Sequence, residues 1–152
     1  MNKGLKIALI IIPIVIVLMI AGLLGIVFLA LNGTANADEY KIGNDVVASI
    51  KAVVGQRDVT STETSISDGV TTKTMKYTSD TVYEDLLEYA TYLMEEEDFV
   101  LTENMNLKVS PGTIEMAKES EEEGKILLLT IKYNKSGYTL ILQKGAGELT
   151  LY

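Results

Sequence analysis

The chain has 152 residues, a formal net charge of −8 and no cysteine, histidine or tryptophan. The missing cysteine excludes disulfides, thiol nucleophiles, thiolate metal sites and the acylated cysteine of a bacterial lipoprotein. The missing histidine removes the commonest general base and zinc ligand. Residues 1–37 hold only Lys3 and Lys6 (+2), whereas residues 38–152 hold the other 11 Lys and Arg and all 21 Asp and Glu (−10). This charge argues against nucleic acid as a partner, because phosphates need a basic face.

The first element is an apolar segment, residues 7–31, whose 25 residues include no charge. As a helix it spans roughly 37 Å, enough for a ~30 Å hydrocarbon core with some tilt. We therefore predict a transmembrane signal anchor. Lys3 and Lys6 precede it and Asp38 follows it, so the positive-inside rule places residues 1–6 in the cytoplasm and residues 38–152 outside. The expected location is the cell membrane, with a single pass.

Ala35, Ala37 and Asp38 offer an alternative to a retained anchor. Ala35-Asn36-Ala37 fits the small-x-small pattern of signal peptidase, which would cut before Asp38 and release a secreted protein. The apolar segment is about twice as long as the 7–15-residue core of a typical cleaved signal, which favours retention. Both outcomes place the domain outside. Within the segment, Ala21 and Gly25 form a small-xxx-small pair that can associate helices, although such residues are common in membrane helices.

Residues 32–43 are predicted to be a polar juxtamembrane linker, and residues 44–152 the extracytoplasmic domain. Asn44 or Asp45 can cap a helix over about 45–54, because apolar residues recur there at helical spacing and Gly55 suits its end. Residues 57–77 alternate Thr or Ser with apolar residues around the turn Ser67-Asp68-Gly69. This pattern predicts a β-hairpin, with a flexible Thr-rich stalk as the alternative.

A second, longer helix is predicted to begin near Ser79, Asp80 and Thr81, with Thr81 and Glu84 as a capping box. Its apolar residues fall within an arc of about 160° and its glutamates fall opposite. This helix should therefore lie on a sheet, with its acidic face in water and its end before Phe99. The residues of the apolar face are Val82, Tyr83, Leu86, Leu87, Tyr89, Ala90, Leu93 and Met94.

Four strands are predicted after this helix. The third is apolar on both faces at its start and is expected to be central, and Glu148 to Tyr152 can add a short edge strand. The order α-β-β-α-β-β-β-β predicts an α+β domain, with two helices packed on a mostly antiparallel sheet of five to six strands. The four strands run from Phe99 to about Leu107, over 113–116, over 125–133 and over 138–142, with turns at 110–112, 121–124 and 134–137.

The sequence holds no catalytic or metal-binding motif. The acidic clusters at 95–98 and 121–123 lack the alternating pattern of a calcium loop, so a solvated surface explains them better. A serine elbow, a phosphate loop and a dinucleotide fingerprint are all missing. We expect no catalytic residue, no cofactor and no metal, and hence no enzyme. A carboxylate-dependent hydrolase, which needs two buried acids facing a cleft, is the remaining enzymatic alternative.

Tyrosine is frequent, with eight residues, and suits binding surfaces. Core packing explains Tyr83 and Tyr89, and cross-strand pairing explains Tyr133 and Tyr138. Only Tyr40 and Tyr152 lie in segments that look unpacked.

The lysine-poor anchor, Tyr-Thr-Ser-Asp at 77–80 and Gly-Tyr-Thr-Leu at 137–140 resemble small membrane-anchored or secreted α+β domains of Gram-positive, clostridia-like bacteria. The resemblance implies no activity. We expect a non-catalytic domain that binds an envelope protein or glycan. Its N-terminal helix is expected to contact membrane lipid and to anchor the domain. The alternative is an accessory subunit that docks into a membrane complex through its transmembrane helix.

Overall fold

The computed structural model describes residues 8–11, 26–27 and 37–151. The predicted transmembrane segment, residues 7–31, lies mostly outside this range, as do Ala21, Gly25 and Ala35. Its described parts are two short strands, β1 (Ala8–Ile11) and β2 (Ile26–Val27). No helix in the described part of the chain is long and apolar enough to cross a bilayer. The transmembrane helix therefore stays a prediction.

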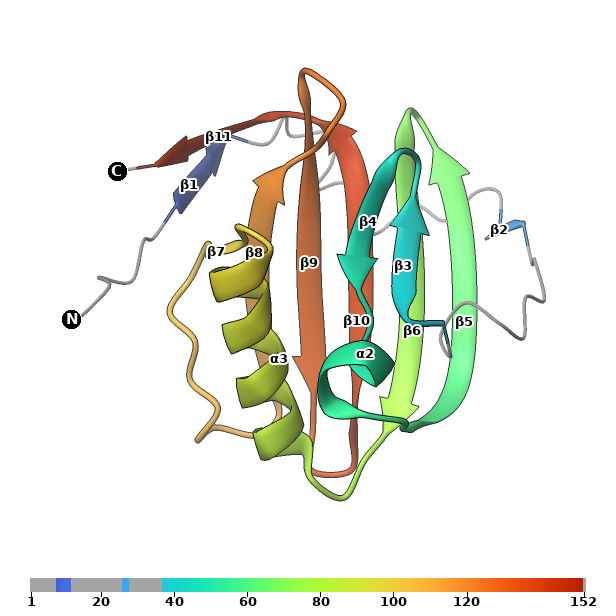
Figure 1. The fold of residues 1–152 in the computed structure, drawn as a ribbon, viewed down its shortest axis with the longest axis vertical. Coiled ribbons are helices and arrows are strands. Elements are labelled where there is room, and N and C mark those ends of the chain that lie inside the picture. Colours follow the sequence, from blue (N-terminus) through green and yellow to red (C-terminus); the bar gives the residue numbers. More distant parts are fainter. Residues whose placement is uncertain (1–7, 12–25, 28–36, 152) are drawn as a thin grey trace.

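An antiparallel sheet of six strands from residues 58–146 forms the body of the domain (Figure 1). Its strand order is β5-β6-β10-β9-β8-β7, and β2 adds two residues beside β5. With two helices on this sheet, the α+β class predicted from the sequence is confirmed. The strands are β5 (Asp58–Ser67), β6 (Val70–Thr78), β7 (Val100–Leu101), β8 (Gly112–Glu119), β9 (Lys125–Tyr133) and β10 (Gly137–Ala146).

One face of the sheet carries a hairpin and both helices (Figure 1). The hairpin consists of β3 (Glu39–Ile42) and β4 (Asp45–Ala48), and the helices are the short α2 (Ile50–Val54) and the long α3 (Val82–Glu96). The tail is a strand as predicted, β11 (Glu148–Leu151), but it pairs with β1 in a separate two-stranded sheet.

The hydrophobic core lies between the sheet and this covering layer, because each element turns an apolar face toward it. Strand β9 has the predicted bounds and lies beside β10 in the middle of the sheet. Burial of one leucine stabilises the fold by about 2 kcal/mol, so these central positions dominate its stability. Fully buried side chains here include Leu129 and Ile131 of β9, Leu140 and Leu142 of β10, and Leu86, Tyr89, Ala90 and Leu93 of α3.

Both hairpins predicted from turn residues are confirmed. β5 and β6 meet at Asp68 and Gly69, which adopt φ values of 49° and 81°. β9 and β10 meet at a turn where Asn134 Oδ1 accepts hydrogen bonds from the backbone N–H groups of Ser136 (2.8 Å) and Gly137 (3.0 Å). The second turn lies at the same end of the sheet as the start of α3 (Figure 1).

The predicted helix over about 45–54 is wrong in its first half. Asp45–Ala48 is strand β4, and the helix begins at Ile50, with Ser49 rather than Asn44 or Asp45 as its N-cap. The hairpin forms because Gly43, at φ 61°, permits a tight turn between β3 and β4. A short apolar run that fits a helix fits a strand equally well, and the partner strand settles the choice.

Strand β3 also lies within the range expected to be linker. Tyr40 and Ile42 are 0% and 1% exposed and pack in the main core. The expectation that Tyr40 lies in an unpacked segment is therefore wrong. The alternation of these two buried residues with exposed Glu39 and Lys41 is the period-2 signal of a strand.

The strand predicted from Phe99 to about Leu107 is much shorter. Only Val100 and Leu101 pair with β8, and residues 102–111 form a loop that leads to Gly112. Two other strands are longer than predicted: β8 extends to Glu119 and β10 to Ala146. Pairing with β9 along its whole length explains both extensions.

Candidate functional site

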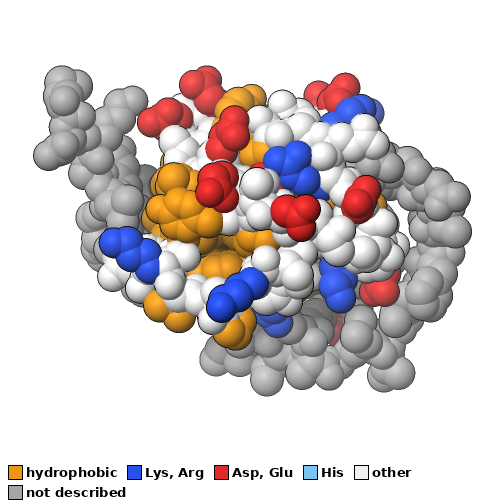
Figure 2. Space-filling view, turned by 90° about the horizontal axis from the view of Figure 1, so that it is seen from below, with side chains coloured by type: hydrophobic (Ala, Val, Ile, Leu, Met, Phe, Trp, Pro, Cys, Tyr) orange, Lys and Arg blue, Asp and Glu red, His pale blue; other side chains and the backbone are white. Residues whose placement is uncertain are grey.

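A pocket of about 240 Å³ opens at the end of the sheet where α3 begins. Three parts of the chain form it: the start of α3, the 102–111 loop, and the end of β9 with the turn that follows. Figure 2 looks onto this end, where hydrophobic side chains gather around a hollow with basic and acidic side chains nearby. The lining residues are Asp80, Val82, Tyr83, Glu84, Leu107, Ser110, Tyr133, Asn134 and Lys135.

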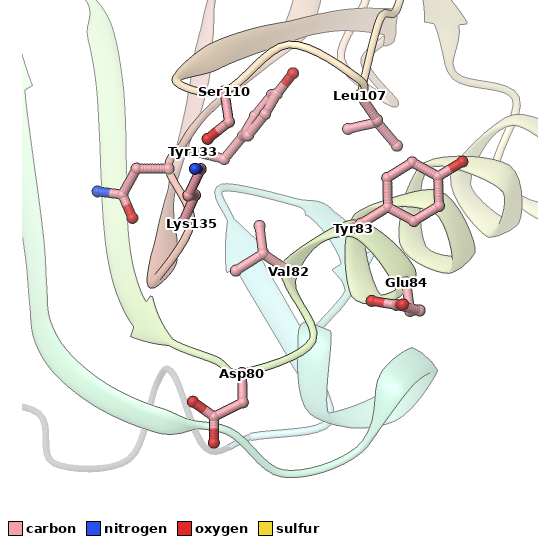
Figure 3. Close-up of a pocket in the computed structure, with 9 residues that line it drawn as sticks. Asp80, Val82, Tyr83, Glu84, Leu107, Ser110, Tyr133 and Lys135 are labelled. Carbon is pink, nitrogen blue, oxygen red and sulfur yellow. The ribbon is translucent and has the colours of Figure 1, made fainter.

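The pocket has an apolar base and a polar rim (Figure 3). Tyr83 and Leu107 lie on one side, Tyr133 and Lys135 on the other, and Val82 between them. Val82 is 8% exposed, whereas Tyr83 is 47% exposed. A buried apolar base and a charged rim suit a ligand with an apolar side chain. That side chain would enter the pocket, and the charged residues of the rim would orient the polar groups beside it.

Tyr133 holds the wall formed by the 102–111 loop. Its hydroxyl lies 2.9 Å from the carbonyl oxygens of both Asn106 and Val109. Burial raises the pKa of this hydroxyl, so it stays protonated and able to donate. A Cβ at Gly112 would lie 2.2 Å from the Tyr133 oxygen, so glycine is required there for the ring to reach the loop.

The variant Tyr133→Phe is expected to loosen this wall. Loss of the hydroxyl leaves two loop carbonyls without their donor, which costs about 1 kcal/mol of unfolding free energy. Amide hydrogen exchange in residues 102–111 should rise by a larger factor than exchange in β9, where it follows only the change in global stability. Urea unfolding and exchange mass spectrometry measure both effects. Exchange in the loop at the wild-type rate would show that Tyr133 does not fix the wall.

Apolar surface extends from the pocket along α3. Tyr83 and Leu87, one turn apart, are 47% and 41% exposed, and Val109 of the loop is 56% exposed. The prediction that Tyr83 and Leu87 face the core is wrong, because the buried face of the helix is rotated toward Asp85 and away from these two residues. We call the three side chains of Tyr83, Leu87 and Leu107 the α3 surface.

Asp85 fixes the start of α3, and sequence reasoning missed it. Its carboxylate is 3% exposed and accepts hydrogen bonds from Arg57 Nε at 2.7 Å and Arg57 Nη2 at 2.6 Å. Three hydroxyls also donate: Ser79 at 2.7 Å, Thr81 at 2.9 Å and Tyr138 at 2.9 Å. Burial raises the pKa of Asp85, but these donors outweigh it and lower the pKa from 3.8 to about 2.

The predicted capping box is therefore wrong. Thr81 is the N-cap residue, but it makes no side-chain cap bond and donates to Asp85 instead. The spacing of the helix gives little sign that Asp85 is buried, because at 100° per residue Asp85 lies about 40° beyond Tyr89, the edge of the predicted apolar arc. An acid in that position needs partners, because an unpaired buried charge is costly.

A second buried charge cluster lies around Lys144 of β10. Its Nζ is 2.6 Å from Asp45 Oδ2 and also contacts the carboxylate of Glu122. Asp45 accepts further hydrogen bonds from Ser120 Oγ at 2.6 Å and from the backbone N–H of Glu121 at 2.8 Å. Burial lowers the pKa of Lys144, but its two acidic partners outweigh burial and raise it. The cluster ties β4 to the β8–β9 turn.

The acidic clusters of the sequence take part in local structure. Glu122 pairs with Lys144 and Lys125, and Glu97 accepts a hydrogen bond from the backbone N–H of Ala48 at 2.8 Å. In the described part of the chain, no group of three or more acidic side chains is placed to hold a metal ion.

Of the predicted processing site, Ala37 and Asp38 lie at the edge of the domain beside Ser49, away from the pocket. No protein-family model, curated protein or solved structure matches this chain. Any function must therefore be argued from the geometry of the domain itself.

Proposed function

We propose that the chain is a membrane-anchored extracytoplasmic domain that binds a basic segment of another envelope protein through the α3 surface. The observation that carries the proposal is the pocket at the start of α3, which opens next to exposed Tyr83 and Leu87. Exposed apolar side chains around a concave site mark interaction surfaces. An apolar side chain of the partner would fill the pocket.

Membrane attachment is supported by the composition of residues 7–31. Eighteen of these 25 residues are Ile, Leu, Val or Phe. Each contributes roughly 0.3–0.6 kcal/mol near the centre of a bilayer helix, so insertion is favoured by several kcal/mol. The pairings of β1 and β2 involve only four and two residues. In a bilayer every backbone N–H and C=O group must be paired, so we expect residues 7–31 to form a helix in place of these strand pairings.

Charge supports a basic partner. Residues 38–152 hold 21 acidic and 11 basic residues, and α3 turns Glu84 and Glu88 outward near Tyr83. Complementary charge speeds association and excludes acidic competitors. A glycan is the second class of partner. Stacking on sugar rings needs open aromatic faces, and among the described residues that line this pocket Tyr83 is the one exposed aromatic side chain. The pocket therefore favours a protein partner over a glycan.

The proposal predicts that the full-length chain in lipid nanodiscs binds a cationic peptide such as Lys-Lys-Trp-Leu-Lys. The chain has no tryptophan, so the emission of the peptide reports burial of its indole directly. We expect a saturable blue shift, and at least about fivefold weaker binding by Tyr83→Ala, since truncation of an interface anchor costs more than 1 kcal/mol.

Tyr92→Ala is the matched control, because Tyr92 lies on the same helix, is 37% exposed and does not line the pocket. It should bind like the wild type, and the acidic peptide Glu-Glu-Trp-Leu-Glu should not bind. Equal binding by the two tyrosine variants would place the peptide elsewhere and contradict the proposed site.

A further inference from the structure

The peptide bond between Ala37 and Asp38 lies against Ser49, which is 0% exposed. Ser49 Oγ donates a hydrogen bond to the carbonyl oxygen of Ala37 at 2.6 Å, and its backbone N–H donates to the carbonyl oxygen of Asp38 at 3.1 Å. A single buried residue therefore holds the carbonyls on both sides of the bond that a signal peptidase would cut.

The chain is also fixed immediately after this bond. Tyr40 is 0% exposed, and its hydroxyl bonds to the hydroxyl of Tyr77 at 2.5 Å and accepts from the backbone N–H of Ile50 at 3.1 Å. Lys51 pairs with Asp38 at 3.3 Å. The three residues that follow the bond are thus held by α2 and the core.

A protease binds its substrate as an extended segment and places the scissile carbonyl oxygen among its own donors. In the folded domain the Ala37 oxygen is already bonded to Ser49, and Tyr40 cannot leave the core without loss of β3. The bond can be reached only in the unfolded chain or by local opening of residues 37–42.

We infer that the Ala37–Asp38 bond is a processing site that the folded domain closes, with Ser49 as the residue that closes it. The reaction is hydrolysis: water adds to the Ala37 carbonyl carbon, the C–N bond breaks, Ala37 becomes a carboxylate and Asp38 an amine. Retention or release of the domain then depends on whether cleavage or folding comes first. The inference rests on the proposed export of the domain and not on its pocket.

The structure also shows what cleavage would leave. A chain beginning at Asp38 keeps the bond from Ser49 N–H, the pair with Lys51 and all of β3. It loses the bond from Ser49 Oγ to Ala37 and the short pairings of β1 with β11 and of β2 with β5. The cut therefore falls at the boundary of the domain, and a chain cut during export can still fold and leave the membrane.

The test incubates the purified full-length chain in detergent micelles with a bacterial signal peptidase. Mass spectrometry follows the fragment 38–152. The folded wild type should be cut at least about tenfold more slowly than Leu140→Asp, which places a charge at a fully buried position of β10 and disrupts the domain. Ser49→Ala should be cut at least about twofold faster than the wild type, because it loses the bond to Ala37 and the N-cap bond that Ser49 Oγ accepts from the backbone N–H of Ala52.

Tyr133→Phe is the matched control, because it removes a hydroxyl whose two hydrogen bonds go to the 102–111 loop and not to residues 37–42. It should be cut at the wild-type rate. The inference is overturned if Leu140→Asp is not cut after Ala37, if the wild type is cut as fast as Leu140→Asp, or if Ser49→Ala and Tyr133→Phe behave alike. Failure of the cationic peptide to bind would overturn the proposed pocket and leave this result unaffected.

Discussion

Replacement of Asp85 by alanine is expected to lower the free energy of unfolding by about 3–5 kcal/mol. The substitution leaves the Arg57 guanidinium and the hydroxyls of Ser79, Thr81 and Tyr138 without their shared acceptor. Groups that stay buried and unpaired bear the full cost of desolvation. Urea unfolding of the full-length chain measures the loss.

The same substitution should change the pH dependence of stability. In the unfolded chain the carboxyl of Asp85 titrates near 3.8, and in the folded domain its pKa is about 2. Its contribution, roughly 2 kcal/mol by linkage, is therefore complete above the unfolded pKa and is lost as the pH falls toward 2. The difference in stability between the wild type and Asp85→Ala should narrow over that range. Glu84→Ala, at the exposed neighbouring position, should cost less than about 0.5 kcal/mol, and an equal loss in both variants would contradict the role of Asp85.

Lys144→Met is expected to cost about 3–5 kcal/mol, because it leaves Asp45 buried without its cation. The two side chains are 5% and 2% exposed. Burial raises the pKa of Asp45, and the donors Lys144, Ser120 and Glu121 together lower it. Without Lys144 the carboxyl protonates more easily, so the deficit should shrink as the pH falls below about 4.

The chain offers a matched control for this variant. Lys125 pairs with the same Glu122 at 3.3 Å, but its side chain is 41% exposed. Lys125→Met should cost no more than about 1 kcal/mol. Urea unfolding measures both variants. Equal losses of unfolding free energy in Lys144→Met and Lys125→Met would contradict the stabilising role of the buried Lys144–Asp45 pair.

The fold was largely predictable because its strongest elements have strong local signals. Strand β9 is a continuous apolar run between turns, and the turns at Asp68-Gly69 and Asn134–Gly137 carry residues that favour them. Pairing between strands is not encoded locally, and it explains the errors. β4 was predicted as helix because its partner β3 was not recognised, and the 102–111 loop was predicted as strand because nothing local shows that pairing stops at Leu101.

The candidate site was harder to predict than the fold. Amphipathic spacing on α3 places Tyr83 and Leu87 on the apolar side, but the rotation of the helix on the sheet decides that they stay exposed. Leu107 and Lys135 meet at the pocket from loops far apart in the sequence. Asp85 lies about 40° outside the predicted apolar arc, so helical spacing does not indicate its burial. Its partner Arg57 lies 28 residues away, so the pairing could not be predicted.

Export of residues 38–152 on a retained anchor is the central claim, and single-cysteine labelling tests it most directly. The chain has no cysteine, so Asn2→Cys and Glu96→Cys each introduce one, before the anchor and on an exposed site of α3. In intact bacterial cells a membrane-impermeant maleimide should label Glu96→Cys. It should label Asn2→Cys only after lysis, and both chains should stay in the membrane fraction at full mass. Labelling of Asn2→Cys in intact cells, or protection of Glu96→Cys, would contradict the orientation, and a chain of 38–152 in the medium would contradict the anchor.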